Sequence, residues 1–353
     1  MPAPLPDLHG KRCLVTGATG FIGSHLIPKL ASLGAHIRAL AWSGEPQPML
    51  PDGPDEILHG DLLHPASIAG NCRDVEVVIH LAARVTDWGP RKWFYSSICT
   101  ATRNLFEEAD REGVSRFVFM SSVAACGVHR HLRGFREWDP CVPAGIPYGD
   151  LKLETEQWIR EAAPRAGMDW TIVRPCNVTG PGSVWVCDPI RRMRSAAGLP
   201  LLDGGAYDAC LVDIGSLTDG IIRAAFDPAG ANQIFHFRDE WQASWRQYLT
   251  ELGLMAQTAP RGQLPFGLAW RLGSSLERAG NWLGVRAPVT RLGAGLLGRE
   301  LTVSTLNAQE RLGWEPSRSY ADAMARIYEW VQTGPARIRP AGRMRDALQA
   351  LRG

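Results

Sequence analysis

The sequence predicts an α/β fold in which a doubly wound parallel sheet carries a smaller, mostly helical lobe near the C-terminus. Three observations predict it: strand and helix patterns alternate from the start, the strand-like runs are apolar without alternation, and a glycine-rich turn follows the first strand. Strands that are apolar on both faces indicate a parallel sheet covered by helices on both sides. Its crossovers should be right-handed.

The alternation runs through the first half of the chain. Strand-like runs are expected at residues 12–16, 35–41, 75–81, 116–120 and 170–173, with a further strand ending at Gly60. Helical apolar spacing is expected at residues 21–33, 93–112 and 148–163. Each helix lies between two strands, as crossover connections require.

The turn after the first strand is suited to a dinucleotide. Gly17, Gly20 and Gly23 allow a tight turn, close approach of a pyrophosphate, and tight packing of helix on strand. The helix that follows offers free N–H groups and a positive dipole end. We therefore expect Thr19, Phe21 and Ile22 to contact the cofactor as well.

The ends of the second and third strands bear on the choice of cofactor. An NAD site usually has an acidic residue at the end of the second strand, where this chain has Ala41 followed by Trp42. Because no carboxylate repels a 2′-phosphate and Arg38 is nearby, we favour NADP slightly over NAD. After the third strand, Asp61 and Leu62 either contact the adenine or begin the next helix, and we favour the adenine.

After residue 182 the pattern changes, because Pro, Gly and Trp become frequent and helices dominate. Residues 208–225 read as a strand and then a helix, which predicts a return to the sheet. We expect a dinucleotide-binding domain at residues 1–180, lobe segments at 181–207 and 231–333, a return to that domain at 208–230, and a basic tail at 334–353.

Composition excludes several classes of protein. The 353 residues are 45% hydrophobic and 21% charged, which excludes a disordered chain, a collagen-like repeat and a coiled coil. The net charge of +2 gives no reason to expect nucleic acid as a partner. The eight cysteines lack C-x-x-C and zinc spacing, so we expect free thiols, no metal and a cytoplasmic location. The side chains of the basic tail at residues 334–353 are expected to be exposed to solvent.

The sequence alone does not decide whether the protein contacts a membrane or a second subunit. No signal peptide is visible, and no run of 18 apolar residues could span a bilayer. The segment 264–283 is apolar but carries Arg271, Glu277 and Arg278; a buried or substrate-facing helix is favoured there, with a peripheral membrane contact left open. A homodimer is also left open.

Tyr148 and Lys152 lie four residues apart, on one face of the predicted helix. Hydride transfer to a carbonyl leaves an alkoxide that needs a proton, and a phenol near pKa 10 is a reluctant donor. A nearby ammonium stabilises the phenolate and lowers that pKa. Ser122 follows the strand 116–120 and should reach the same sheet edge, where its hydroxyl can hold the substrate oxygen.

These residues carry a resemblance to a known family. The glycine turn, His80-Leu81-Ala82-Ala83, Ser121-Ser122, Tyr148 with Lys152, and Arg174-Pro175 through Gly180-Pro181-Gly182 resemble the extended short-chain dehydrogenases/reductases over roughly residues 11–333. The stretches 83–90, 288–291, 306–308 and 312–314 resemble the branch that is similar to 3β-hydroxysteroid dehydrogenase/isomerase. That branch includes bacterial reductases of 3-keto groups on lipid-like chains.

The resemblance implies a Rossmann-type fold and specific roles. Ser122 would hold the oxygen, Tyr148 would donate or accept the proton, and Lys152 would stabilise the phenolate and bind the nicotinamide ribose. Further cofactor contacts are implied for Leu81, Ala82, Ala83, Pro175, Asn177 and Val178. Two positions depart from the family pattern: Ile98 replaces an asparagine, which puts a proton relay in doubt, and Cys126 replaces a tyrosine in the pocket wall.

Three functions compete. We favour an NAD(P)-dependent ketone reductase or secondary-alcohol dehydrogenase with a hydrophobic substrate such as a steroid, polyketide or quinone. A nucleotide-sugar epimerase or dehydratase is the alternative, although Tyr207-Asp208 stands where such enzymes usually carry a phosphate-binding arginine; Arg191, Arg192 and Arg194 could substitute. A non-catalytic dinucleotide sensor would not need Ser122, Tyr148 and Lys152.

The hydrophobic substrate is expected in a pocket between the carboxyl edge of the sheet and the lobe. The expected walls are Val85, Trp88, Cys126, Val178, Trp185 and the helix near 264–270. These side chains are apolar or aromatic, so we expect no acid or base in the wall to fix a charged group.

Overall fold

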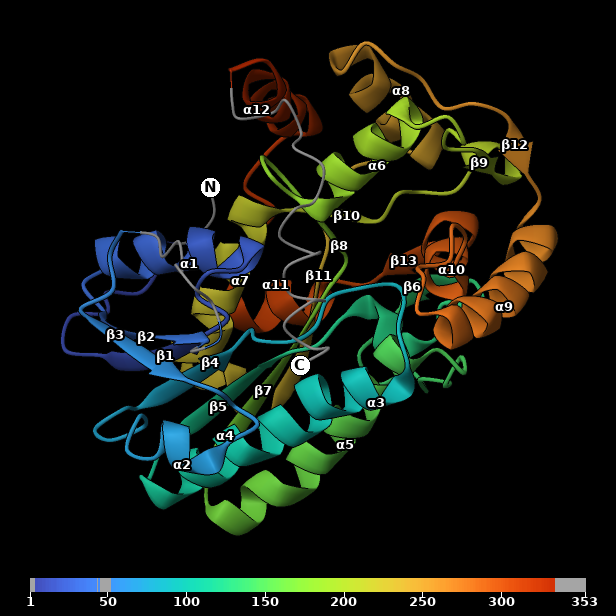
Figure 1. The fold of residues 1–353 in the computed structure, drawn as a ribbon. Coiled ribbons are helices and arrows are strands. Elements are labelled where there is room, and N and C mark those ends of the chain that lie inside the picture. Colours follow the sequence, from blue (N-terminus) through green and yellow to red (C-terminus); the bar gives the residue numbers. More distant parts are fainter. Residues whose placement is uncertain (1–3, 43, 45–51, 334–353) are drawn as a thin grey trace.

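A seven-stranded sheet, with every neighbouring pair parallel, forms the centre of the molecule (Figure 1). The computed structural model describes residues 4–42, 44 and 52–333. The strands lie in the order β11 (Gln233–Phe237), β7 (Asp169–Pro175), β5 (Arg116–Met120), β4 (Val77–His80), β1 (Arg12–Thr16), β2 (His36–Trp42) and β3 (Glu56–Gly60). The order reverses direction at β1, so a crevice opens between the carboxyl ends of β1 and β4.

Both faces of the sheet are covered by helices, which confirms the predicted doubly wound architecture. Within β1, Cys13 and Val15 enter one hydrophobic core and Leu14 enters the other. The first core includes residues of α1 (Phe21–Ser32), α7 (Ile214–Phe226) and α11 (Leu306–Leu312). The second includes residues of α2 (Pro65–Ile68), α4 (Ala101–Arg111) and α5 (Pro147–Ala166). Burial on both faces explains why the strands are apolar without alternation.

The helix predicted at residues 93–112 forms as one helical run that changes its winding. It begins as α3 (Arg91–Phe94), continues as a π-helical segment at Tyr95–Thr100, and ends as α4. Ile98, at the position where the family pattern has an asparagine, is fully buried in that π segment. An apolar side chain there offers no hydrogen bond to a relay water.

The C-terminal lobe is mostly helical and stands over the carboxyl edge of the sheet (Figure 1). A core cluster joins α6 (Val184–Arg194), α8 (Trp245–Met255) and α12 (Tyr320–Thr333), while α9 (Phe266–Leu283) packs on α10 (Arg291–Gly298). Three two-stranded sheets complete it: β6 (Leu132–Phe135) with β13 (Leu301–Val303), β8 (Asn177–Thr179) with β10 (Leu211–Asp213), and β9 (Leu201–Leu202) with β12 (Gln263–Leu264).

The return of the chain to the sheet differs from the expectation for residues 208–230. A strand and a helix form there, but the strand, β10, pairs with β8 outside the central sheet. The strand that rejoins the central sheet is β11, beside β7. The strand pattern alone did not show which partner each short strand would take, because partner choice depends on contacts distant in the sequence.

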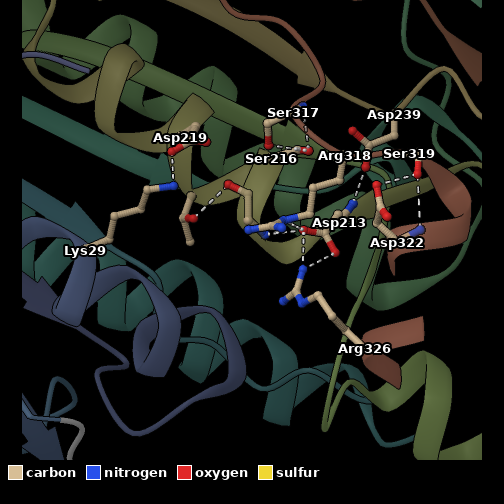
Figure 2. Close-up of polar contacts among 12 residues, drawn as sticks. Lys29, Asp213, Ser216, Asp219, Asp239, Ser317, Arg318, Ser319, Asp322 and Arg326 are labelled. Atoms are coloured by element: carbon tan, nitrogen blue, oxygen red, sulfur yellow. Dashed lines mark hydrogen bonds and ion pairs between the residues drawn. The ribbon is translucent and has the colours of Figure 1, made fainter. Parts of the chain in front are cut away.

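Asp213, at the end of β10, connects α12 to the rest of the fold (Figure 2). Its buried carboxylate accepts from the N–H of Gly215 at 2.8 Å and so caps α7. The same carboxylate lies 3.3 Å from Arg318 Nε and 3.3 Å from Nη1 of Arg326 in α12. One carboxylate therefore connects β10, α7 and α12.

The segment 264–283 forms α9 and has an apolar exposed side. Trp282 is 85% exposed, and Leu268, Leu272, Leu283 and Val285 are exposed as well. Across residues 4–42, 44 and 52–333, no helix has the length and hydropathy needed to cross a membrane. The basic tail expected at 334–353 lies outside the described residues.

Candidate active site

Two glycines of the turn after β1 are required by close backbone approach. Gly17 has a φ of 70°, and a Cβ atom there would lie 2.8 Å from the backbone nitrogen of Ala82. A Cβ atom on Gly23 would lie 2.3 Å from the carbonyl oxygen of Gly17. No side chain caps α1 at Gly20, which leaves first-turn N–H groups for an anionic ligand. The turn can therefore cradle a phosphate.

A cavity of about 670 Å³ opens beside this turn. It lies between the ends of the central strands and the helical lobe. The residues predicted for cofactor, catalysis and substrate that line it are Gly17, Thr19, Gly20, Phe21, Ile22, Gly23, Leu81, Ala82, Ala83, Val85, Ser122, Tyr148, Lys152, Pro175, Asn177, Val178 and Trp185. One cavity thus brings together the glycine turn, the catalytic candidates and part of the expected substrate wall.

Ser122, Tyr148 and Lys152 meet at the carboxyl edge of the sheet. Ser122 follows β5, whereas Tyr148 and Lys152 lie one turn apart near the start of α5. The pKa of Tyr148 is raised by burial, which outweighs the opposite effect of a hydrogen bond with Ser122, so the lowered pKa that the sequence predicted from Lys152 is not found here. The buried Lys152 Nζ donates to the carbonyl oxygen of Met120 at 2.6 Å and lies 4.5 Å from the ring centroid of Phe119. These contacts fix the ammonium against the end of β5, one helical turn along α5 from Tyr148.

The electrostatic state of Lys152 is set mainly by its burial. Loss of hydration lowers the pKa of its ammonium to about 7, and the nearby charge of Glu156 opposes that shift. Tyr148, Lys152 and Glu156 follow one another at four-residue spacing along α5. Glu156 therefore helps to keep Lys152 charged, which is the state that stabilises a phenolate.

A buried ion pair anchors this face of α5. Glu156 accepts from Arg174 of β7 at 3.0 Å (Nε to Oε1) and 2.5 Å (Nη2 to Oε2), and it also accepts from the hydroxyl of Ser121. Arg174 and Glu156 are both buried. The pair fixes α5 against the ends of β5 and β7, and hence the position of Tyr148 and Lys152.

His80 is a second buried polar connection below the cavity. Its Nδ1 lies 2.7 Å from Thr16 Oγ1, and its Nε2 lies 3.0 Å from Thr102 Oγ1. Burial, with a smaller contribution from the charge of Lys152, lowers the pKa of this imidazole to about 3. A neutral His80 therefore joins β1, β4 and α4.

Four predicted cofactor contacts lie outside the cavity wall. Arg38 lies in the first half of β2, where its Nε donates to Glu56 at 2.9 Å and its Nη1 donates to the carbonyl of Arg73. Trp42 is 44% exposed at the end of β2. The carboxylate of Asp61 accepts from the N–H of Leu63 at 2.8 Å, and the carbonyl of Leu62 accepts from Asn104 at 2.7 Å.

The Asp61 carboxylate holds the turn before α2 but does not cap that helix, whose N-cap is His64, so its contact with the adenine stays a prediction. The pairing of Arg38 with Glu56 leaves its guanidinium committed at the wrong end of β2 for a 2′-phosphate. Both facts follow from side-chain partners that strand patterns do not reveal.

The substrate wall differs from the expectation at three places. Trp88 is buried and packs edge-on against Trp93, with ring centroids 5.8 Å apart. Cys126 is fully buried, and its Sγ lies 4.0 Å from Nε2 of the buried His236. The helix that lines the cavity is α10 rather than α9, through Leu292, Gly293, Leu296 and Leu297. The helix α9 packs on α10 and contributes no residue to the cavity wall.

Charged residues in the wall were not expected. Asp87, Asp188, Arg192 and Arg286 line the cavity, which corrects the prediction that its wall holds no acid or base. The sequence had indicated Arg192 as one of three arginines that could bind a phosphate. Arg286 gave no signal, because it meets Asp87 across a sequence separation of 199 residues.

Two comparisons of sequence agree with this site. Residues 13–235 match the model of the NAD dependent epimerase/dehydratase family. A UDP-glucose 4-epimerase of Vibrio cholerae is 30% identical to this chain over 320 residues, covering 88% of this chain and 92% of that protein. The 4-hydroxy-2-methyl-3-oxo-4-farnesyl-3,4-dihydroquinoline-1-oxide ketoreductase of Stigmatella aurantiaca is 28% identical, covering 92% and 97%.

Solved structures share the architecture. A UDP-glucose 4-epimerase of Thermotoga maritima, crystallised with UDP-glucose, superposes with a TM-score of 0.71 at 20% identity, covering 91% of this chain and 98% of that one. At this identity the likeness shows the fold alone. Together with the sequence relatives, it confirms the predicted extended short-chain dehydrogenase/reductase architecture.

Proposed function

The chain belongs to the NAD-dependent epimerase/dehydratase family, and from that premise we propose that it is a reductase or dehydrogenase. It transfers a hydride between a nicotinamide and the ketone or secondary alcohol of a hydrophobic substrate. The single observation that carries this proposal is that Ser122, Tyr148 and Lys152 share a cavity with apolar and aromatic walls.

Each catalytic residue acts on the substrate oxygen or on its neighbour. The dinucleotide, when bound, supplies or accepts the hydride at the carbonyl carbon. In reduction, Ser122 donates a hydrogen bond to the carbonyl oxygen, and Tyr148 transfers its hydroxyl proton to the developing alkoxide. The ammonium of Lys152 stabilises the resulting phenolate. In oxidation the proton moves from the alcohol to the Tyr148 phenolate.

The cavity wall supports an apolar substrate. Its lining includes Trp185, Trp245, Leu292, Leu296 and Leu297, and Trp245 Nε1 donates to the carbonyl of Leu296 at 3.0 Å. Burial of apolar ligand surface is worth about 25 cal/mol per Å², so roughly 300 Å² would contribute several kcal/mol. The ketoreductase of Stigmatella aurantiaca is named for a ketone that bears a farnesyl group, and such a substrate would suit an apolar wall.

For the cofactor we propose that NADP is accepted at least as well as NAD. Ala41 leaves no carboxylate at the end of β2 to repel a 2′-phosphate. Arg38 does not contribute, because its guanidinium is paired with Glu56. The proposal therefore rests only on the absence of a carboxylate that would repel the 2′-phosphate of NADP.

A nucleotide-sugar epimerase is the second candidate. The relative from Vibrio cholerae favours it, and so do Arg192 and Arg286 in the cavity. However, Arg286 is already paired with Asp87, and a diphosphate would have to enter beside Asp87 and Asp188. Like charges in a partly buried site are costly, so the reductase remains the stronger proposal.

A side-by-side screen tests the two candidates. Purified protein with NAD(H) or NADP(H) is offered hydrophobic ketones and their alcohols, and in parallel UDP- and TDP-sugars. We expect hydride transfer with apolar ketones. We expect no epimerised product from the UDP- and TDP-sugars. Turnover of a nucleotide sugar without activity on any ketone would reject the reductase and favour the epimerase.

A further inference from the structure

Five charged side chains gather at one part of the cavity, between the loop after β4 and the helical lobe. Asp87 Oδ1 accepts from Arg286 Nε at 3.0 Å and from Nη2 at 2.8 Å. Asp188 Oδ1 accepts from Arg191 at 2.5 Å, and its Oδ2 lies 3.7 Å from Arg286 Nη2. Arg192 is the fifth member and lies one helical turn after Asp188 in α6.

Within this cluster the charges do not balance. Three guanidinium groups face two carboxylates, so one positive charge is left over, and Arg192 carries it. Its Nη2 forms a loose ion pair with Asp87 Oδ2 at 3.6 Å, beyond hydrogen-bond length, and among the described residues its Nη1 bonds to the backbone carbonyl of Pro288 at 3.3 Å. By contrast, Arg286 and Arg191 each bond directly to a carboxylate.

The surroundings make this under-compensated charge costly. Burial lowers the pKa of Arg192 and the charge of Arg286 lowers it further, and the nearby carboxylates of Asp87 and Asp188 oppose this shift without reversing it. A guanidinium that has lost water and lacks a bonded carboxylate gains from an anionic partner. Because Arg192 lines the cavity that holds Tyr148 and Ser122, such a partner can be part of the substrate.

The rest of the wall restricts what that substrate can be. Trp185, Leu292, Leu296 and Leu297 suit an apolar body, and one surplus cation suits one negative charge. A diphosphate brings two charges and would face Asp87 and Asp188. A carboxylate matches the guanidinium in charge and can bond to it in a bidentate geometry.

We infer that Arg192 binds the carboxylate of a hydrophobic keto-acid substrate. The inference rests on the proposed ketone reductase, whose substrate class it narrows. Asp87 and Asp188 act as positioning residues, because they hold Arg286 and Arg191 and so leave Arg192 as the receptor. The keto group then lies toward Ser122 and Tyr148.

Binding is tested first, without any turnover. Thermal unfolding is followed with dodecanoate and with dodecanol, which share a chain and differ in charge. Dodecanoate should raise the Tm of the wild-type protein more than dodecanol does, and Arg192→Leu should abolish that difference. Arg194→Leu is the matched control, because Arg194 lies in the same helix but donates to the carbonyl of Ala256 outside the cavity wall. Equal shifts with both ligands, or an unchanged difference in Arg192→Leu, would overturn the inference.

Turnover is tested with oxododecanoic acids, differing in the position of the keto group, and with their methyl esters. Arg192→Leu should lower kcat/KM for the best acid by roughly 10- to 100-fold, mainly through KM, and leave the ester nearly unchanged. Arg192→Lys should restore part of the loss, and NAD(P)H affinity should not change in either variant. Ester turnover without preference for the acid would reject the role of Arg192 and leave the reductase standing. Absence of ketone turnover, with dodecanoate still bound through Arg192, would reject the reductase instead.

Discussion

The ammonium of Lys152 donates a hydrogen bond of 2.6 Å to the backbone carbonyl of Met120, the last residue of β5. This bond joins the start of α5 to the carboxyl edge of the sheet. It holds the ammonium one helical turn along α5 from Tyr148, in the cavity that Ser122 also lines. The position of the catalytic candidates is therefore set by the backbone of the sheet as well as by the helix.

Removal of the proton donor should separate chemistry from cofactor binding. Tyr148→Phe should keep the affinity for NAD(P)H and lower kcat by about 10²- to 10⁴-fold, because only the phenolic proton is lost. Lys152→Ala should lower kcat as well and also weaken cofactor binding, if it contacts the nicotinamide ribose as the family resemblance implies. Steady-state kinetics and nicotinamide fluorescence measure the two effects. A Tyr148→Phe variant with the wild-type rate would remove Tyr148 from the mechanism.

The end of β2 should not discriminate against NADP. Since Ala41 provides no carboxylate and Arg38 is paired with Glu56, we expect NADPH to bind at least as tightly as NADH. Fluorescence titration of the same preparation with both cofactors measures the two Kd values. A tenfold preference for NADH, about 1.4 kcal/mol, would contradict the prediction and point to a contact of Trp42 or the backbone that selects against the phosphate. An Ala41→Asp variant is the matched comparison and should prefer NADH.

Acid should destabilise the protein partly through His80. Its pKa is about 3 in the folded state, against about 6.5 when unfolded, so between these values the unfolded state binds a proton that the folded state does not. Stability is therefore fully present above about pH 6.5 and falls as the pH drops toward 3, by up to ~1.4 kcal/mol per pH unit. Urea unfolding at pH 7.5 and 5.0 should show a smaller loss for His80→Gln than for wild type. Equal losses in both proteins would exclude His80 as a source.

The carboxylate of Asp213 should stabilise the fold by two separable contributions (Figure 2). Asp213→Asn keeps an oxygen that can cap α7 but loses the charge that faces Arg318 and Arg326. Asp213→Ala loses both, so it should lower the free energy of unfolding by about 1 kcal/mol more than Asp213→Asn does. Both arginines are partly exposed and can regain water, which limits the cost of the lost charge. Indistinguishable variants would show that capping contributes nothing here.

The exposed side of α9 should contact anionic lipid surfaces. Trp282 and Leu283 are exposed at the end of α9, Val285 is exposed just after it, and Arg271 and Arg278 are exposed along the helix. We expect co-sedimentation with phosphatidylglycerol vesicles, weaker binding to phosphatidylcholine, and loss of binding in Trp282→Glu. Leu254→Glu is the control, because Leu254 is 73% exposed but lies in α8. Concentration-dependent dimerisation that Trp282→Glu abolishes, without vesicle binding, would show that this side meets a second copy instead.

Much of the fold and half of the site follow from local sequence. The period of apolar residues in β1 and α1, and the spacing of Gly17, Gly20 and Gly23, determine a strand, a turn and a helix in immediate succession. Tyr148 and Lys152 share a helix face because they are four residues apart. Where local rules place residues on one element, the sequence is sufficient.

Partner choice was the part that local rules could not supply. The pattern at 208–225 indicated a strand but not that β10 would pair with β8 while β11 rejoined the sheet. Likewise, Arg38 looked available beside Ala41, whereas its guanidinium is taken by Glu56 of the neighbouring strand. Hydrophobic periodicity carries no information about which charged side chains will meet.

By itself, the sequence determined a doubly wound sheet, a dinucleotide turn, and a Ser122–Tyr148–Lys152 set at one sheet edge. Only the tertiary structure decided that α10 rather than α9 forms the substrate wall, and that Asp87 meets Arg286 and leaves Arg192 without a bonded carboxylate in the cavity. The physical reason is the sequence separation of the residues that interact. Backbone conformation and helix faces depend on residues a few positions apart, whereas the charge balance of a cavity depends on side chains that only the packing of the lobe onto the sheet brings together.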